Sequence, residues 1–317
     1  MTAKVFIDGE HGTTGLQIRA RLAPRDDIAL LSLPHEDRRN TDARRAMLNE
    51  ADLVILCLPD DAAREAVSMI ENPTVKVIDA STAHRVAQGW IYGMPEYEPG
   101  QRDRIAEATR VSNPGCYAIA SIALLHPLVS AGVLPADWPV TINAISGYSG
   151  GGKSLIAAFE DPAAENYTEA PFRVYALGLA HKHLPEIQRR SGLEHRPLFV
   201  PSVGRFAQGM IVQVPLQLWA LPGTPSLADL QKTLAGYYAG CRYVTVASMA
   251  DTAAIDWFEA EALNGSNELR LHVFGNEEGG QAVLAGLLDN LGKGASASTV
   301  QNMNIMLGLP EDAGLAR

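Results

Sequence analysis

The chain has 317 residues, of which 47% are hydrophobic and 20% are charged, and this balance is ordinary for a globular protein with a packed core. Its length is typical of two domains. The formal net charge of −10 repels phosphate backbones, and no long run of basic residues offsets it, so we expect no nucleic-acid partner.

The cysteine spacing and the lengths of the apolar segments indicate a protein in a reducing compartment. Cys57, Cys116 and Cys241 are odd in number and widely spaced, so neither a disulfide framework nor a zinc knuckle is predicted. Val5–Ile7 is too short for the core of a signal peptide, and runs such as Leu53–Leu58 are too short to span a bilayer. We therefore expect a cytoplasmic protein with no metal site and no membrane partner.

The first hundred residues alternate short apolar runs with helical patterns. Strands are predicted at residues 4–7, 28–33, 53–58 and 75–78, and helices at 16–22, 42–50 and 62–70. Strands and helices that alternate in this way are typical of a parallel sheet covered on both faces.

After about residue 140 the pattern changes. Strands are predicted at residues 140–145, 198–200, 210–218, 243–247 and 269–274. The alternation in IVQVPLQLWA, at 211–220, is typical of a half-exposed antiparallel strand. We therefore expect an α+β second domain with a mixed sheet. The last segment, 281–309, is rich in Ala, Leu, Asn and Gly, and we interpret it as helix.

A glycine-rich turn follows the first predicted strand. Gly9, Gly12 and Gly15 form G-x-x-G-x-x-G, a relative of the dinucleotide fingerprint. Glycines let the backbone turn tightly and approach a pyrophosphate, whose charge the N-terminus of the next helix attracts. Thr13 and Thr14 add hydroxyl donors. The alternative is a plain turn between strand and helix, but the position of the motif favours a nucleotide.

The residues after the second strand favour NADP over NAD. NAD-binding proteins usually carry Asp or Glu there for the ribose 2′-hydroxyl. This chain instead has Ser32, and Arg38 and Arg39 follow soon after. The absence of an acid at the strand end, with arginines nearby, favours a 2′-phosphate, so we predict NADP as the cofactor. The alternative is that both arginines only solvate a loop.

Cys116 is the candidate nucleophile. It follows Ser-Asn-Pro-Gly and precedes a helical pattern at 118–129, so it lies at or near a helix N-terminus. The helix dipole stabilises a thiolate there, and a thiolate attacks acyl groups. A buried structural role fits Cys57, inside the apolar run LVILCLP, and Cys241 better.

Several longer runs accompany this cysteine. They are SNPGCYA at 112–118, DASTAHR at 79–85, YGMPE at 92–96, HKHLPEI at 181–187 and DNLGKGASASTVQNMNIMLGL at 289–309. Together with the glycine turn they make the chain resemble the N-acetyl-γ-glutamyl-phosphate reductase family in its shorter form. The runs lie at both ends and in the middle, so the resemblance spans essentially the whole chain. Aspartate-semialdehyde dehydrogenase shares the fold and the thiol chemistry and is the nearest alternative.

The resemblance implies a fold and an activity. The fold is α/β, with a Rossmann-like NADP-binding domain at 1–115 and 289–317 and an α+β catalytic and dimerisation domain with a mixed sheet at 116–288. The activity is the NADPH-dependent reduction of N-acetyl-γ-glutamyl phosphate to the semialdehyde in arginine biosynthesis, through a thioester on Cys116. We also expect a homo-oligomer, either a dimer or a tetramer.

In the family, a histidine of the HKH run accepts the thiol proton and returns a proton to the carbonyl oxygen. The spacing does not rank His181 against His183, and the resemblance points to His181. Glu186 would orient or tune that histidine, and we assign His183 to the substrate. Without the resemblance, two surface histidines beside a helix cap would be the preferred interpretation.

Three further residues are candidates for ligand binding. Arg85 follows a strand end on the side of the sheet where ligands gather, and it would hold the acyl phosphate; a plain surface arginine is equally consistent with the pattern. We assign Asn113, in SNPGC, to the substrate. Asn290, in DNLGKG, resembles the family asparagine that lies near the nicotinamide.

Residues 147–154 also satisfy the P-loop pattern G-x-x-x-x-G-K-[ST]. A P-loop enzyme needs a parallel sheet around the loop and a strand that ends in an aspartate for magnesium. The resemblance instead gives a glycine-rich loop beside Cys116, although the family often has Ala and Arg where Gly152 and Lys153 stand. An ATP-using enzyme and an NADP-sensing binding protein are the alternatives of other classes.

Overall fold

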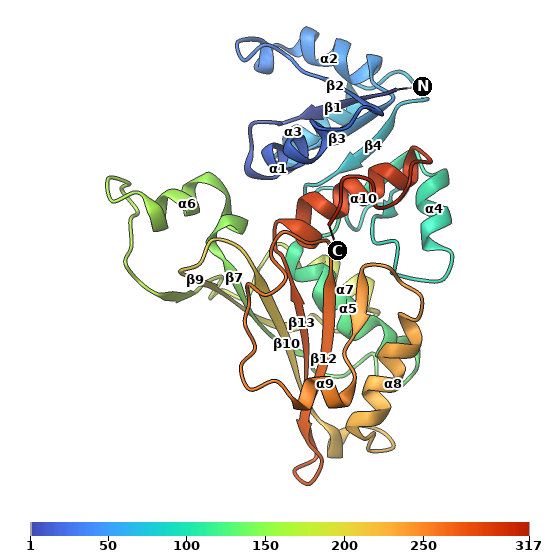
Figure 1. The fold of residues 1–317 in the computed structure, drawn as a ribbon, viewed down its shortest axis with the longest axis vertical. Helices are drawn as coiled ribbons and strands as arrows, with labels where there is room; N and C mark the ends of the chain where they lie inside the picture. The colour runs from blue at the N-terminus through green and yellow to red at the C-terminus, as the bar shows by residue number, and fades with distance from the viewer. Residues whose placement is uncertain (1, 317) are drawn as a thin grey trace. The chain divides into compact units, whose positions relative to one another are not determined.

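The computed structural model describes residues 2–316, which form two compact units (Figure 1). The first unit comprises residues 2–115 and 295–316, and the second comprises residues 116–294. Residues 289–294, which we expected in the first of these parts, belong to the second unit.

A six-stranded sheet forms the centre of the first unit, in the order β2-β1-β3-β4-β6-β5. Every pairing in it is parallel, so the predicted parallel sheet is confirmed. Its strands are β1 (Ala3–Asp8), β2 (Ile28–Leu31), β3 (Leu53–Leu56), β4 (Lys76–Asp79), β5 (Ile91–Tyr92) and β6 (Arg110–Ser112).

Helices cover both faces of this sheet. They are α1 (Thr13–Leu22), α2 (Thr41–Glu50), α3 (Asp60–Ser68), α4 (Gln101–Glu107) and α10 (Ala297–Met306), with a short 3-10 helix, η1 (Asp37–Arg39). Successive residues of β1 point to opposite faces: Val5 and Ile7 pack in the core that contains α1 and α10, and Phe6 packs in the core that contains α2 and α3.

The second unit contains a seven-stranded mixed sheet in the order β11-β12-β13-β10-β7-β9-β8. The strands are β7 (Thr141–Gly147), β8 (Phe172–Val174), β9 (Leu198–Gly204), β10 (Met210–Gln217), β11 (Val244–Val246), β12 (Leu269–Asn276) and β13 (Gln281–Leu288). The helical segments are α5 (Cys116–Ser130), η2 (Tyr148–Gly151), α6 (Gly152–Glu160), α7 (Leu184–Ser191), η3 (Leu218–Ala220), α8 (Leu227–Tyr237), α9 (Met249–Ala253) and the first three residues of the π-helical turn η4 (Gly292–Ser296), whose last two residues belong to the first unit. The predicted α+β unit with a mixed sheet is confirmed.

The helix predicted across 281–309 is wrong in its first part. Residues 281–288 form β13, which pairs antiparallel with both β10 and β12 in the middle of the sheet. Ala and Leu favour helix in isolation, but the pairing on both sides overrides that preference. Gly286 has a further reason to be small, since a Cβ there would lie 3.3 Å from the Cβ of Ala120 on α5.

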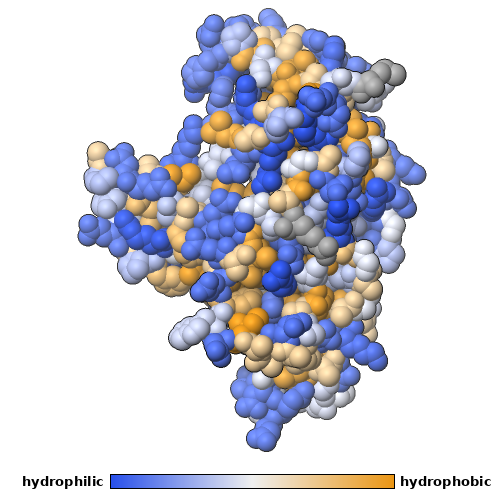
Figure 2. Space-filling model, viewed as in Figure 1, coloured by the Kyte–Doolittle hydropathy of each residue, from blue (hydrophilic) through white to orange (hydrophobic). Residues whose placement is uncertain are grey.

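The alternation predicted for residues 211–220 is present in β10, where Gln213, Pro215 and Gln217 are exposed and the residues between them are buried. Within residues 2–316, no helix has both the length and the apolar character needed to cross a membrane. Apolar residues nevertheless reach the surface in several places among hydrophilic ones (Figure 2).

Candidate active site

A cavity of about 290 Å³ lies in the first unit, where β1, β2 and β3 end. Its lining includes the glycine turn from Gly9 to Gly12, Leu33 beyond β2 and Leu58 beyond β3. β1 lies between β2 and β3 in the sheet. In open parallel sheets, ligands bind outside the carboxyl ends of the strands, at the point where the strand order reverses, and this cavity is at that place.

The glycines of the turn are required by close backbone contacts. Gly9 has φ +92°, and a Cβ on it would lie 2.4 Å from the carbonyl oxygen of Cys57. A Cβ on Gly15 would lie 2.4 Å from the carbonyl oxygen of Gly9. The amide of Gly12 closes the turn on Gly9 O at 3.0 Å, and α1 begins at the next residue, Thr13. The turn therefore presents backbone and the start of a helix to the cavity, which suits a diphosphate.

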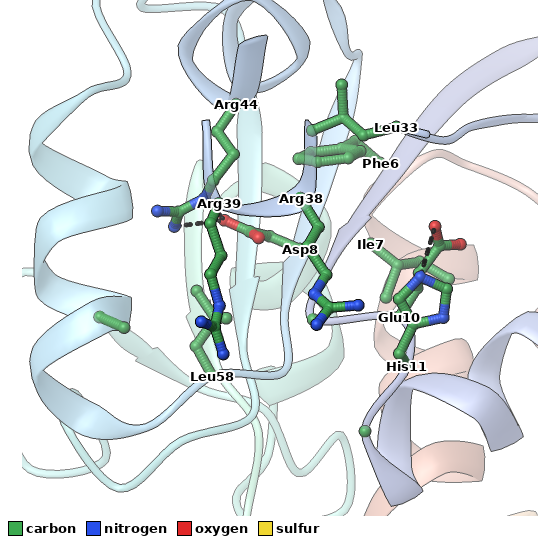
Figure 3. A pocket seen from close by; sticks show the side chains of 13 residues that line it. Phe6, Ile7, Asp8, Glu10, His11, Leu33, Arg38, Arg39, Arg44 and Leu58 are labelled. Carbon is green, nitrogen blue, oxygen red and sulfur yellow. Dashed lines mark hydrogen bonds and ion pairs between the residues drawn. The ribbon is translucent and has the colours of Figure 1, made fainter. Parts of the chain in front are cut away.

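Arg38 and Arg39, both on η1, line the same cavity, and their side chains reach into it (Figure 3). Both residues are exposed, and in the part of the chain that the structure describes neither forms an ion pair with a carboxylate. Arg44 also lines the cavity, but its Nη2 lies 2.8 Å from Oδ2 of Asp8, so its charge is compensated. The two uncompensated guanidinium groups can therefore receive an anionic ligand group.

A carboxylate does lie at the end of β2, although the residue that directly follows the strand is Ser32. Glu10, from the glycine turn, accepts a hydrogen bond from Ser32 Oγ at 3.2 Å and forms an ion pair with Arg19. Arg19 Nη1 also donates to Ser32 Oγ, at 3.3 Å. Sequence reasoning missed Glu10 because its own position, inside the turn, gives no sign that the chain folds it toward β2.

Arg85 and Asn113 are buried, with 6% and 1% of their surfaces exposed. Arg85 Nε donates to Asn113 O at 3.0 Å, and its Nη2 donates to Ala80 O at 3.1 Å. The side-chain amide of Asn113 donates to Ala295 O and to Ser298 Oγ, and it accepts from Asn302. Both side chains therefore hold the segment that leads from β6 toward Cys116.

Cys116 is the first residue of α5, the position expected for it. Its surroundings are crowded on one side, since a Cβ on Gly294 would lie 2.7 Å from the Cβ of Cys116. Gly294 belongs to η4, and sequence reasoning did not single it out. A glycine in the run GKGAS gives no local sign that a distant cysteine packs on it, so only the fold reveals this constraint.

His181 and His183 lie side by side before α7, with ring centroids 4.8 Å apart. The backbone amide of His183 donates to Nδ1 of His181 at 3.2 Å, and Tyr175 Oη lies 3.5 Å from Nε2. Tyr117, the residue after Cys116, meets both imidazoles edge to face. His183 and Glu186, on α7, are buried with 5% and 2% exposed, whereas His181 is half-buried.

Asn290 is buried in the second unit, and its amide is engaged on both sides. Its Nδ2 donates to Ser149 Oγ at 3.2 Å, and its Oδ1 accepts from the amide of Gly209 at 2.8 Å. It thereby fixes the 147–154 loop. That loop follows β7, which pairs antiparallel with β10 on one side, and so lacks the parallel sheet of a P-loop. Among residues 2–316, no group of His, Cys, Asp and Glu has a metal-binding arrangement.

Comparison with known proteins agrees with these features. The chain is 52% identical to N-acetyl-γ-glutamyl-phosphate reductase 2 of Nostoc sp., over 98% of its own length and 99% of that protein. It is 56% identical to the N-acetyl-γ-glutamyl-phosphate reductase of Brucella ovis, over 97% and 100% of the two chains. The chain belongs to the N-acetyl-γ-glutamyl-phosphate reductase family. The resemblance inferred from its motifs is therefore confirmed.

Two domain models match this member of the reductase family. The model of the semialdehyde dehydrogenase NAD-binding domain matches residues 34–108, and the model of the semialdehyde dehydrogenase dimerisation domain matches residues 116–290.

Solved structures show the same fold. Aspartate-semialdehyde dehydrogenase II of Vibrio cholerae, complexed with ASA, aligns with a TM-score of 0.69 at 14% identity, over 97% of this chain and 99% of that one. Aspartate-semialdehyde dehydrogenase of Candida albicans, solved with NADP, aligns with a TM-score of 0.63 at 13% identity, over 97% and 99%. At these identities the likeness shows the fold alone.

Cys57 and Cys116 are both partly exposed. The groups packed around the sulfur of Cys57 nevertheless oppose its ionisation. Burial raises the pKa of the Cys57 thiol to about 12, and the nearby carboxylates of Asp79 and Asp8 act in the same direction. A raised pKa keeps Cys57 protonated at neutral pH, where the protonated thiol is a poor nucleophile.

We therefore predict selective alkylation by iodoacetamide at neutral pH. Cys116 should react, because the start of α5 favours a thiolate, whereas Cys57 should stay unmodified until the pH approaches its raised pKa of about 12. Peptide mass spectrometry over a pH series measures this, and the urea-unfolded protein, in which all cysteines should react, is the control. Equal rates for Cys57 and Cys116 in the folded protein would contradict the assignment.

Proposed function

We propose that this chain reduces N-acetyl-γ-glutamyl phosphate to N-acetylglutamate semialdehyde with NADPH, through a thioester on Cys116. The observation that carries the proposal is the position of Cys116 at the start of α5, beside the Tyr117 ring that contacts both histidines. It occurs in a chain that is more than half identical to proteins named for this activity. The cofactor, when bound, supplies a hydride.

The residues of the first unit fit NADP. At Gly9 and Gly15 a side chain would collide with backbone, so both positions require glycine, which leaves the backbone of the turn accessible to a bound diphosphate. Arg38 and Arg39 would hold the 2′-phosphate, because they face the cavity without carboxylate partners. We assign Gly12, Thr13 and Thr14 to the diphosphate and Ser32 to the ribose.

In the second unit, we propose that the Cys116 thiolate attacks the acyl carbon, so that a C–S bond forms and phosphate leaves. Reduction of the resulting thioester then releases the aldehyde and regenerates the thiolate. Backbone N–H groups at the start of α5 would stabilise the developing oxyanion. His181 is the proposed catalytic histidine, with His183 beside the substrate and Glu186 tuning the pair from α7.

Three of the assigned residues would act indirectly, by holding neighbouring segments of the chain in place. We propose that Arg85 and Asn113 serve substrate binding by holding the peptide ahead of Cys116, since their polar groups already bond to backbone and to neighbouring side chains. We propose that Asn290 serves the nicotinamide side of the site by fixing the loop at Ser149.

The competing functions make different predictions. An aspartate-semialdehyde dehydrogenase would prefer aspartate semialdehyde, an NADP sensor would bind NADP without turnover, and a P-loop enzyme would bind ATP with magnesium. The antiparallel neighbour of β7 speaks against the last of these. The cytoplasm remains the expected location.

We propose a homo-oligomer whose interface includes the edge strand β8 and the residues after it. The match of the second unit to a dimerisation domain supports self-association. Large apolar side chains are exposed along this one segment, namely Phe172, Val174, Leu177 and Leu179. β8 ends the sheet order and pairs only with β9 among the described strands, so its outer edge is open. An exposed apolar edge of this kind calls for a partner, and a second copy is the one that the family suggests.

The first test is the reverse reaction. With N-acetylglutamate semialdehyde, phosphate and NADP, the unmodified protein should form NADPH, and aspartate semialdehyde should be a poorer substrate. Cys116→Ser should lose at least about 10³-fold in kcat while it keeps its NADP affinity, because serine lacks a thiolate. Cys241→Ser is the matched control and should stay active. A Cys116→Ser variant with substantial turnover would refute the covalent route.

The second test concerns cofactor choice. The unmodified protein should bind NADP more tightly than NAD. The double variant Arg38→Ala and Arg39→Ala should weaken NADP binding roughly 10- to 100-fold, since charge-assisted hydrogen bonds contribute about 1.5–3 kcal/mol. NAD binding should change little. Calorimetry measures both, with Arg196→Ala, an exposed arginine of the second unit, as control. Equal affinities for NADP and NAD in the unmodified protein would refute the assignment of these arginines to the 2′-phosphate.

The third test concerns assembly. Light scattering should give the unmodified protein a mass of two or four chains. Charges placed on the proposed interface, Phe172→Glu with Leu177→Glu, should reduce that mass toward one chain, because a buried carboxylate without a partner is costly. Trp257→Glu, at a residue that is 86% exposed outside this segment, is the control. An unchanged mass for the double variant would place the interface elsewhere.

A further inference from the structure

Two tyrosines connect the residue after Cys116 to the ring of His181. Tyr117 Oη lies 3.1 Å from the carbonyl oxygen of Ser202, and Tyr175 Oη lies 3.1 Å from Tyr117 Oη. Tyr175 Oη is in turn 3.5 Å from Nε2 of His181. All of these groups belong to the second unit. They form a row that runs from a backbone carbonyl to an imidazole.

The two ends of this row have fixed hydrogen-bonding roles. A carbonyl oxygen only accepts, so Tyr117 must donate its one proton to Ser202 O. The oxygen of Tyr117 is then free to accept from Tyr175. At the other end, a backbone amide only donates, so Nδ1 of His181 must accept from the amide of His183.

The middle of the row follows from its ends. Tyr175 gives its one proton to Tyr117, so its oxygen can only accept toward His181. A neutral imidazole whose Nδ1 accepts carries its proton on Nε2, the atom that faces Tyr175. Both ends therefore require the same tautomer. Reversing the row would leave no proton between Tyr117 Oη and Ser202 O, which are 3.1 Å apart, and would point Nδ1–H at the amide of His183.

Both phenols keep their protons at neutral pH. Burial raises the pKa of Tyr175 to about 12 and outweighs the opposite effect of its hydrogen bond with Tyr117; the nearby Cys116 acts in the same direction as burial. Burial also raises the pKa of Tyr117; Tyr175 and Cys116 add to that effect, and a hydrogen bond with Ser146 acts against it. The influence of Cys116 on both hydroxyls indicates that the row runs close to the thiol.

We propose that Tyr175 is a positioning residue for His181, and that the row holds the imidazole neutral with its proton on Nε2. This inference rests on the proposed function. Nε2 in that tautomer has no lone pair to accept the Cys116 proton, so of the two roles expected for the histidine the structure favours hydrogen-bond donation to the substrate carbonyl oxygen. No proton needs to leave the ring in this role. The 3.5 Å separation from Tyr175 is long, so the N–H can turn to a closer oxygen.

The test combines a spectrum with kinetics on the full-length protein. With ¹⁵N-labelled histidine, the two-bond couplings of His181, assigned by their loss in His181→Gln, should show the proton on Nε2 at neutral pH. Tyr175→Phe should lower kcat of the reverse reaction roughly 10- to 100-fold with little change in KM, because the imidazole loses its fixed orientation. Tyr167→Phe, a phenol whose one described polar neighbour is Arg205, is the matched control and should keep its kcat.

The outcomes separate the two proposals. A proton on Nδ1, or an ionised ring at neutral pH, would overturn the inference, as would a Tyr175→Phe kcat within twofold of the unmodified protein. If Tyr175→Phe loses its NADP affinity or its thermal stability, the spectrum of the unmodified protein decides alone. An unmodified protein that does not turn over any semialdehyde would refute the proposed function and leave the tautomer measurable.

Discussion

The burial of most of α5, from Tyr117 to Leu125, is the constraint on which the proposed chemistry depends. The helix is apolar on all sides and packs against α7, α8 and the strands β10 and β13. A helix held in this way cannot shift or rotate without opening the core. Cys116 is its first residue, so the core itself fixes the sulfur, and Gly294 leaves only enough room for the Cys116 side chain. Tyr117 follows immediately, which brings the hydrogen-bonded row to the same place.

The charge around the cavity of the first unit differs from the charge of the chain as a whole. The chain is acidic overall, with a net charge of −10, yet the cavity of the first unit presents two arginines without carboxylate partners. The carboxylates that line that cavity, Asp8 and Glu10, are each paired with an arginine. We therefore propose that Arg38 and Arg39, rather than the total charge, set the local potential at the cavity, and this would let an acidic protein bind a phosphorylated cofactor there.

The sequence predicted the features that depend on neighbouring residues. The parallel strands of the first unit and the start of α5 each follow from a local pattern. The strand β13 was missed because its partners β10 and β12 override the helix preference of Ala and Leu. The Arg44–Asp8 pair, the carboxylate of Glu10 and the contact of Tyr175 with His181 were also missed. All of these are contacts between segments, and no spacing in one segment reports them.

The central claim is that Cys116 carries the acyl group, and trapping that group tests the claim most directly. The protein is mixed with N-acetylglutamate semialdehyde and NADP without phosphate, so that the thioester can form but cannot be released to phosphate. After an acid quench, peptide mass spectrometry should find the N-acetylglutamyl group on the Cys116 peptide, and hydroxylamine should remove it. Rapid turnover on adding phosphate with no adduct at Cys116, or an adduct on another residue, would contradict the account.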